Sequence, residues 1–322
     1  MRVNRFTTLL SLLLGMLLSS AASAAEQRLV ILSASDAPAY SRAATRLTQR
    51  LQLQGQTTGS SYVLSREQIN PELHQALTHA QHIVAIGSKA CDYAAKHSTS
   101  SAVSCGFITS NSFEAIREQV PGRSNLTALY IDQPLQRLLN LASLIGHGQE
   151  PYRVGLLSSN TQSNRSVIAD SEANNSDLEI RSVELQLEDN PVKVIEPLIF
   201  NSDVLIVQPS AKLFNRLVAK LILQLSLRYK VPVIGFSQKY SEAGALVSLY
   251  ASPEDIGEDL AEYLIHPTEE KHKSHTLRHG RHFSVSVNSN VARKLQSMID
   301  ADALEQQLKT MESNTDAALR SR

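Results

Sequence analysis

Short apolar runs separated by helix-length segments constrain the fold of this chain more than any other feature. The clearest set lies at residues 204–207, 231–237 and 245–250, with an amphipathic segment at residues 213–229 after the first run. Buried strands of a parallel sheet have this nearly continuous apolar character, and the crossover between two such strands needs about a dozen residues or more. Residues 28–108 show the same alternation. The sequence therefore predicts an α/β protein with two doubly wound parallel-sheet lobes.

The N-terminal residues have the pattern of a cleavable export signal. Two arginines precede an apolar stretch at residues 6–18, and an Ala-Ser-Ala sequence at residues 22–24 matches a small-residue cleavage site. A membrane anchor would need about 20 apolar residues, which is longer than this stretch. No cysteine that could carry a lipid lies near the cleavage point. We therefore expect residues 1–25 to be a signal peptide and the mature protein to be periplasmic, with no lipid anchor.

Charge and composition narrow the function classes. The chain of 322 residues carries 31 basic and 31 acidic residues, so its formal net charge is zero. Nucleic-acid binding needs a basic surface that neutralises phosphates, so we expect that nucleic acid is not a partner of this protein. The sequence also lacks a Gly-x-Ser-x-Gly nucleophile motif, a Walker phosphate loop and a zinc-protease motif. We therefore expect a binding protein that uses no cofactor, rather than an enzyme.

The chain has only two cysteines, Cys91 and Cys105. An isolated pair in an oxidising compartment favours a disulfide, and a helix start and the strand that follows it can approach closely enough for one. The alternative is two buried thiols, because free cysteine packs as a small apolar residue. In either case we expect a structural role.

A series of short motifs resembles one known family. The motifs lie at residues 84–90, 121–127, 154–157, 203–207, 231–235, 244–246, 256–257 and 286–292. In this order and spacing they resemble ABC-transporter substrate-binding proteins of the type I periplasmic-binding fold, in the branch that includes tryptophan- and tyrosine-binding members. The resemblance implies two lobes joined by a three-strand hinge, with a small-molecule ligand held between them. We also expect a monomer.

Chain order and the resemblance together predict the domain boundaries. Residues 26–131 and 251–280 are expected to form lobe 1, residues 132–250 and 281–312 to form lobe 2, and residues 313–322 to form a flexible tail. Asp132 precedes a strong helical pattern and is expected to serve in the cap region of that helix.

Small polar residues follow the predicted strands and are the candidate ligand-binding residues. In open α/β sheets, ligands bind at the carboxyl ends of the strands. Asn164 is included because it matches a position where the family often carries Asn. The candidates are Ser33, Ser35, Gly87, Ser88, Thr109, Ser158, Asn160, Asn164, Gln208, Ser210 and Ser237. The alternative is that these residues are helix caps and turn residues, which also occur at strand ends.

The neutral character of this set predicts the ligand class. Related proteins usually have an Asp-Pro pair after the strand at residues 103–108, where this chain has Thr109-Ser110-Asn111. Ser210 and Ser237 stand where family members often carry an acidic residue. A buried ammonium group needs a carboxylate partner. We therefore expect a small polar ligand that is neutral or anionic.

Four histidines near the C-terminus have a spacing that a helix would place on one face. Lysines and arginines lie between them, a glycine at position 280 interrupts a helix, and no neighbouring carboxylate completes a ligand set. We therefore expect no metal site here, but a solvated basic loop or a docking surface for a membrane partner. The residues are His272, His275, His279 and His282.

Two function classes fit these observations. The first is a solute-binding protein that delivers its ligand to an ABC-type permease of the inner membrane. The second is a sensory or accessory module that signals ligand occupancy to a membrane receptor. Fold alone does not distinguish them.

Overall fold

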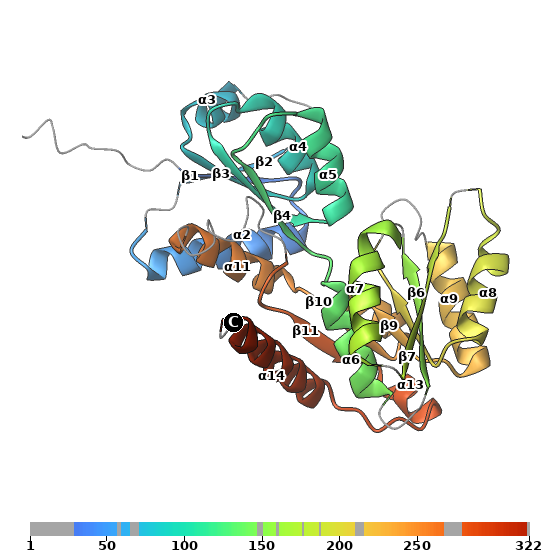
Figure 1. Ribbon diagram of the computed structural model, residues 1–322. Coiled ribbons are helices and arrows are strands. Elements are labelled where there is room, and N and C mark those ends of the chain that lie inside the picture. The colour runs from blue at the N-terminus through green and yellow to red at the C-terminus, as the bar shows by residue number, and fades with distance from the viewer. Residues whose placement is uncertain are drawn as a thin grey trace, which may run out of the picture.

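The computed structural model describes residues 29–56, 59–64, 71–146, 151–158, 161–175, 177–186, 188–209, 216–266 and 279–320. The predicted export signal lies outside these residues. Figure 1 shows two α/β lobes, each built on its own sheet. Within the described part of the chain, no helix combines the length and apolarity that crossing a membrane requires.

The first sheet has five strands in the order β2-β1-β3-β4-β5, and all neighbours are parallel. Helices α3, α4 and α5 cover one face, and α2 covers the other together with α11 from later in the chain. The strands are β1 (Leu29–Ser33), β2 (Ser60–Val63), β3 (His82–Ile86), β4 (Ala102–Ile108) and β5 (Leu126–Tyr130). The helices are α2 (Pro38–Leu53), α3 (Pro71–His79), α4 (Ser88–His97), α5 (Ser110–Gln119) and α11 (Pro253–Ile265).

The second sheet has six strands in the order β11-β10-β9-β8-β6-β7, and only β11 is antiparallel to its neighbour. Helices α6, α7 and α14 cover one face, and α8, α9 and α10 cover the other. The strands are β6 (Tyr152–Ser158), β7 (Leu178–Glu184), β8 (Val204–Val207), β9 (Val233–Gly235), β10 (Val247–Tyr250) and β11 (Ser284–Val287). The helices are α6 (Leu135–Ile145), α7 (Thr161–Asn174), α8 (Pro191–Phe200), α9 (Arg216–Tyr229), α10 (Gln238–Ala243), α13 (Ser289–Lys294) and α14 (Ala301–Arg320).

The chain passes between the two sheets three times. It leaves the first sheet at the end of β5 and enters α6, and it leaves the second sheet at the end of β10 and returns through α11. Its final passage reaches β11. Because β5 and β10 both end at a crossing, the carboxyl edge of each sheet faces the other lobe, as Figure 1 shows. Ligands of open α/β sheets bind at these edges.

Three sequence predictions of secondary structure differ from the structure. The short helix α10 was not predicted, because its six residues are too few to show a helical period. The residue pattern predicts a helix that begins at the cap Asn288 and runs to about residue 299, and α13 has that cap but ends at Lys294. Gln296, which follows, has φ of 55°, a value that a continuing helix does not allow. Helix α14 continues to Arg320 and so includes most of the predicted tail at residues 313–322, whose flexibility stays a prediction.

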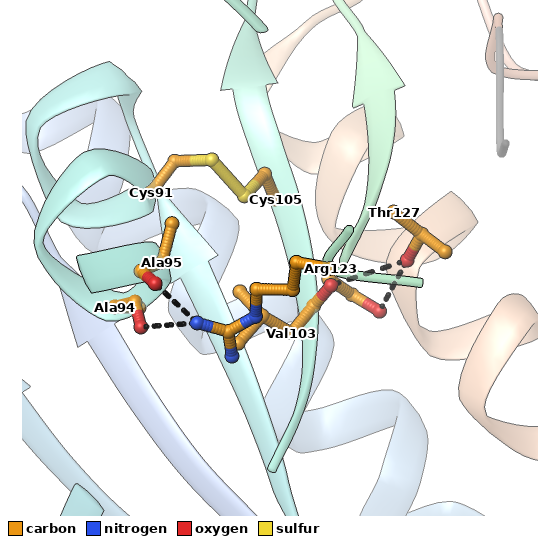
Figure 2. Close-up of a disulfide and its surroundings, with 8 residues drawn as sticks. Cys91, Ala94, Ala95, Val103, Cys105, Arg123 and Thr127 are labelled. Atoms are coloured by element: carbon orange, nitrogen blue, oxygen red, sulfur yellow. Dashed lines mark hydrogen bonds between the residues drawn. A yellow bond between two sulfur atoms is a disulfide. The ribbon is translucent and has the colours of Figure 1, made fainter. Parts of the chain in front are cut away.

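A disulfide links α4 to β4. Cys91 and Cys105 are both fully buried, with their Cα atoms 5.4 Å apart (Figure 2). The predicted bridge is therefore confirmed, and the alternative of two thiols is wrong. Arg123 lies nearby and donates to the carbonyls of Ala94 and Ala95 at the C-terminal end of α4, where a cation is favourable.

Replacing both cysteines by alanine should lower the free energy of unfolding by about 3 kcal/mol, because the bridge closes a loop of about 15 residues in the unfolded chain. The sequence separation of the two residues is 14. Urea denaturation of the oxidised protein and of the double variant measures the difference. Reducing the unmodified protein should have the same effect. An unchanged stability in both experiments would show that the bridge does not constrain the unfolded chain.

His82, at the start of β3, is half-buried and forms a 2.9 Å hydrogen bond with the Ser104 hydroxyl. Burial lowers the pKa of His82 from 6.5 to about 4, because a charged imidazolium loses hydration there. The unfolded chain therefore binds a proton near pH 6.5, and the folded chain does so only near pH 4. Between these values the unfolded state holds more protons, so stability falls as the pH falls.

His82→Asn should remove this part of the pH dependence. Unfolding free energies of the original protein should decrease by about 2–3 kcal/mol more than those of the variant between pH 6.5 and about 4. Denaturation across this range checks the difference. The matched control is His74→Asn, at an exposed histidine of α3. Parallel pH profiles for the original protein and His82→Asn would contradict the prediction.

Candidate functional site

Three predicted residues meet at the carboxyl edge of the second sheet. Ser158 ends β6, Gln208 follows the adjacent strand β8, and Asn164 lies in the first half of α7. The Asn164 side-chain amide donates to Ser158 Oγ at 3.2 Å and to Gln208 Oε1 at 3.0 Å. Ser158 and Asn164 are buried, whereas Gln208 is half-buried. This group of side chains, the Ser158–Asn164–Gln208 triplet, fixes the orientation of the Gln208 amide at the edge that faces the first lobe.

The first sheet brings its own predicted residues to the opposing edge. Ser33 ends β1, Gly87 and Ser88 follow β3, and Thr109 follows β4, so they lie along three adjacent strands. The backbone N–H of Gly87 donates to Gly106 O at 2.8 Å and is used within the sheet. The N–H of Ser88 at the first turn of α4 remains a predicted ligand contact.

The backbone of this edge is unusual at two positions. Gly87 has φ of +98°, and a Cβ atom there would lie 2.8 Å from Cβ of Ala34, so only glycine fits. Phe107 has φ of 57°, and the pairing of β4 with β5 shifts register around it. A non-glycine residue in this conformation costs of order 1–3 kcal/mol, and bulges of this kind often lie next to binding sites. Phe107 packs edge-on against Tyr40, with ring centroids 5.1 Å apart.

Several candidates serve as caps or turn residues, as the alternative interpretation of the strand ends expected. Thr109 is the N-cap of α5 and accepts from Ser112 N, and Ser237 is the N-cap of α10 and accepts from Tyr240 N. Ser35 Oγ accepts from Ala37 N at 3.3 Å. A ligand role for these three residues stays a prediction. Asn160 and Ser210 lie outside the described residues.

Asp132 has a different role from the predicted one. Helix α6 begins after Pro134 without a side-chain cap, so the prediction that Asp132 serves that helix is wrong. The carboxylate instead accepts from Ser110 N at 2.9 Å and from Ser110 Oγ at 2.6 Å, at the first turn of α5. A carboxylate is favourable at a helix N-terminus. Asp132 therefore joins the first crossing to α5, and its oxygens are occupied within the protein.

Side chains tie the crossings to one another. Asp255 in α11 caps its own helix through Ser252 N and also accepts from Ser284 Oγ at 3.0 Å, which joins the second crossing to the third. Buried Arg137 of α6 donates to Gly280 O at 3.3 Å, pairs with Glu312 of α14 and stacks over Phe283 at 4.3 Å. The third crossing is therefore held against both lobes.

The two described histidines of the predicted basic loop are not free in solvent. His279 Nδ1 lies 2.6 Å from Asp132 O, and its ring packs against Tyr130. His282 Nδ1 lies 2.6 Å from Asp259 Oδ1 of α11, and this hydrogen bond raises the pKa of His282. Each contacts an element that is distant in sequence, so neither lies in a fully solvated loop, although the His282 side chain is 42% exposed. His272 and His275 lie outside the described residues.

Two surface hollows lie away from the facing edges. One, of about 470 Å³, opens at the amino ends of the second sheet, beside Tyr152, Asp203 and Tyr229. The other, of about 450 Å³, lies between α6, α14 and the third crossing. Neither contains a residue predicted to bind the ligand. The polar residues at the facing sheet edges remain the candidate site.

Comparison with known proteins shows the fold. No known family model matches the sequence, and no curated protein matches it. Among solved structures, the ligand-free, open form of a substrate-binding protein with adhesive properties from Clostridium difficile matches with a TM-score of 0.59 and 15% identity, covering 85% of this chain and 96% of that chain. A conserved domain protein from Vibrio cholerae matches with a TM-score of 0.51 and 16% identity, covering 87% and 98%. An ABC domain from Streptococcus pneumonia in complex with L-Trp matches with a TM-score of 0.50 and 14% identity, covering 86% and 98%. The chain therefore has the two-lobed type I periplasmic-binding fold.

Asn164→Ala should lower the free energy of unfolding by about 1–2 kcal/mol, because it leaves the buried Ser158 hydroxyl and Gln208 Oε1 without this donor. Chemical denaturation measures the effect. The control is Asn140→Ala in α6, where the lost side-chain contact is an exposed hydrogen bond from Gln136. That variant should differ from the original by less than about 0.5 kcal/mol. Equal effects of the two substitutions would show that the triplet is not a buried network.

Proposed function

We propose that this protein is an exported solute-binding protein that clamps a small polar ligand between its lobes and delivers it to an ABC-type permease. The observation that carries the proposal is the Ser158–Asn164–Gln208 triplet, which comes from three elements and lies at the sheet edge facing the first lobe. Hydrogen bonds within the triplet orient the Gln208 amide in advance. Preorganised polar groups of this kind increase affinity because less conformational freedom is lost on binding.

The charges of the residues at the facing sheet edges are the basis for the proposed ligand class. The predicted ligand residues in the described part of the two facing edges supply hydroxyl, amide and backbone N–H groups, and the Asp132 carboxylate is occupied by Ser110. Two more carboxylates stand at these edges, Asp36 after β1 and Glu184 at the end of β7, and we propose that neither pairs with a ligand. An α-ammonium group buried here would need a carboxylate partner. The Streptococcus neighbour was solved with L-Trp. For this chain we propose instead a neutral or anionic solute.

Opening and closing of the lobes is the expected response to ligand. The fold joins the lobes through three chain crossings, and hinge closure around a ligand is a known motion of two-lobed binding proteins. The Clostridium neighbour is described as ligand-free and open. Its fold supports the proposal that the lobes of this protein also move as units.

A thermal-shift screen of the mature protein with sugars, nucleobases, carboxylates and amino acids should find a neutral or anionic compound that raises the melting temperature, because a ligand that binds only the folded state stabilises it. Gln208→Ala should then weaken binding of that compound by about 0.5–1.5 kcal/mol, the usual contribution of one hydrogen bond. Titration calorimetry measures the change.

The matched control is Gln119→Ala, at an exposed residue in the last turn of α5, at the opposite end of that helix from Thr109. It should bind as the original protein does. Small-angle scattering should show a smaller radius of gyration when the compound is bound. Strong stabilisation by a free amino acid that is lost when its ammonium group is masked would overturn the proposed ligand class.

A further inference from the structure

A cluster of metal-ligating side chains lies beside the third crossing, away from the sheet edges. Asp259 of α11 is only 6% exposed, and its carboxylate accepts from the backbone N–H groups of Arg281 and His282 at 3.3 Å. His282 Nδ1 lies 2.6 Å from Asp259 Oδ1. The close approach depends on Gly280, because a Cβ atom there would lie 2.1 Å from Asp259 Oδ2. The backbone of the crossing therefore fixes this carboxylate in place.

Glu262 adds a third ligand from the same helix. It lies three residues after Asp259, a spacing that places both carboxylates on one side of α11. One ligand atom from each of Asp259, Glu262 and His282 lies within 4.8 Å of the others. Zn²⁺ binds carboxylate oxygen and imidazole nitrogen at about 2.0–2.2 Å, so ligand atoms on one ion lie at most about 4.4 Å apart, close to the separation found here.

The charge of the cluster favours a cation. Two carboxylates and a neutral imidazole carry a charge of −2. Asp259 is buried, and a buried carboxylate is stabilised by a hydrogen-bonding partner, as His282 provides here, or by a coordinated metal ion. A divalent ion balances both carboxylates, and the partly exposed His282 and Glu262 leave a path for it from solvent.

We propose that Asp259, Glu262 and His282 form a binding site for a divalent transition metal of the Zn²⁺ class. The imidazole distinguishes this set from Ca²⁺ and Mg²⁺ sites, which use oxygen ligands. Three protein ligands leave a coordination position for water. The ion would connect α11, which packs on the first sheet, to the segment that enters β11 of the second sheet. Sequence reasoning missed the site because the two carboxylates lie 20 or more residues before His282.

The test uses untagged, full-length mature protein that has been stripped with EDTA and held at about pH 8, because protons compete with a metal ion for its ligands at lower pH. Titration calorimetry with ZnCl₂ should show one saturable site per chain. Co²⁺ in place of Zn²⁺ should give visible absorption bands of a nitrogen- and oxygen-ligated ion. Absence of saturable Zn²⁺ binding in the folded protein would overturn the proposal.

Glu262→Gln is the informative variant, because it removes one ligand and keeps the Asp259–His282 hydrogen bond that holds the crossing. It should weaken Zn²⁺ binding about tenfold or more and change the Co²⁺ spectrum. Glu254→Gln, at an exposed residue of the same helix, should leave both unchanged. A combined His272→Ala and His275→Ala variant should also bind as the original does. If that variant loses the metal while Glu262→Gln retains it, the site belongs to the sequence cluster of histidines and the proposal is wrong.

Discussion

The chain leaves each sheet at the carboxyl end of a strand, and this constraint decides which edge of each sheet faces the other lobe. Strand β5 delivers the chain to α6, and β10 delivers it back to α11, so both carboxyl edges face the opposite lobe. Parallel strands expose their turns and helix starts at these edges, where backbone N–H groups and small polar side chains gather. The topology therefore places two polar surfaces opposite each other before any specific ligand contact is considered.

The polar residues at the edges divide into two kinds. Asn164 donates to both Ser158 and Gln208, whereas Thr109 and Ser237 accept from the backbone of the helices they cap. Both kinds are neutral polar side chains at or near the end of a strand, so the sequence alone does not distinguish them. In the structure, the two kinds differ in whether the hydrogen-bond partner lies on another helix or strand. That difference identifies the triplet as the better-supported part of the site.

The sequence predicted the layers of this fold well because buried parallel strands have a strong local pattern. The apolar run at residues 204–207 coincides with β8, and the runs at residues 231–237 and 245–250 contain β9 and β10. Contacts between distant segments have no such pattern. The bond from Asp132 to Ser110 and that from Asp259 to His282 join residues that are 22 and 23 positions apart. Only the three-dimensional path of the crossings brings these residues together.

The path of the chain also determines when each lobe can fold during synthesis. The first lobe needs α11, at residues 253–265, to complete its core, although all five strands of its sheet come before residue 131 in the chain. The second lobe lacks its edge strand β11 until residues 284–287 exist, and α14 follows later still. Contacts between segments so far apart in sequence form slowly, because long loops must close first. Neither lobe can therefore complete its hydrophobic core until most of the chain has been synthesised.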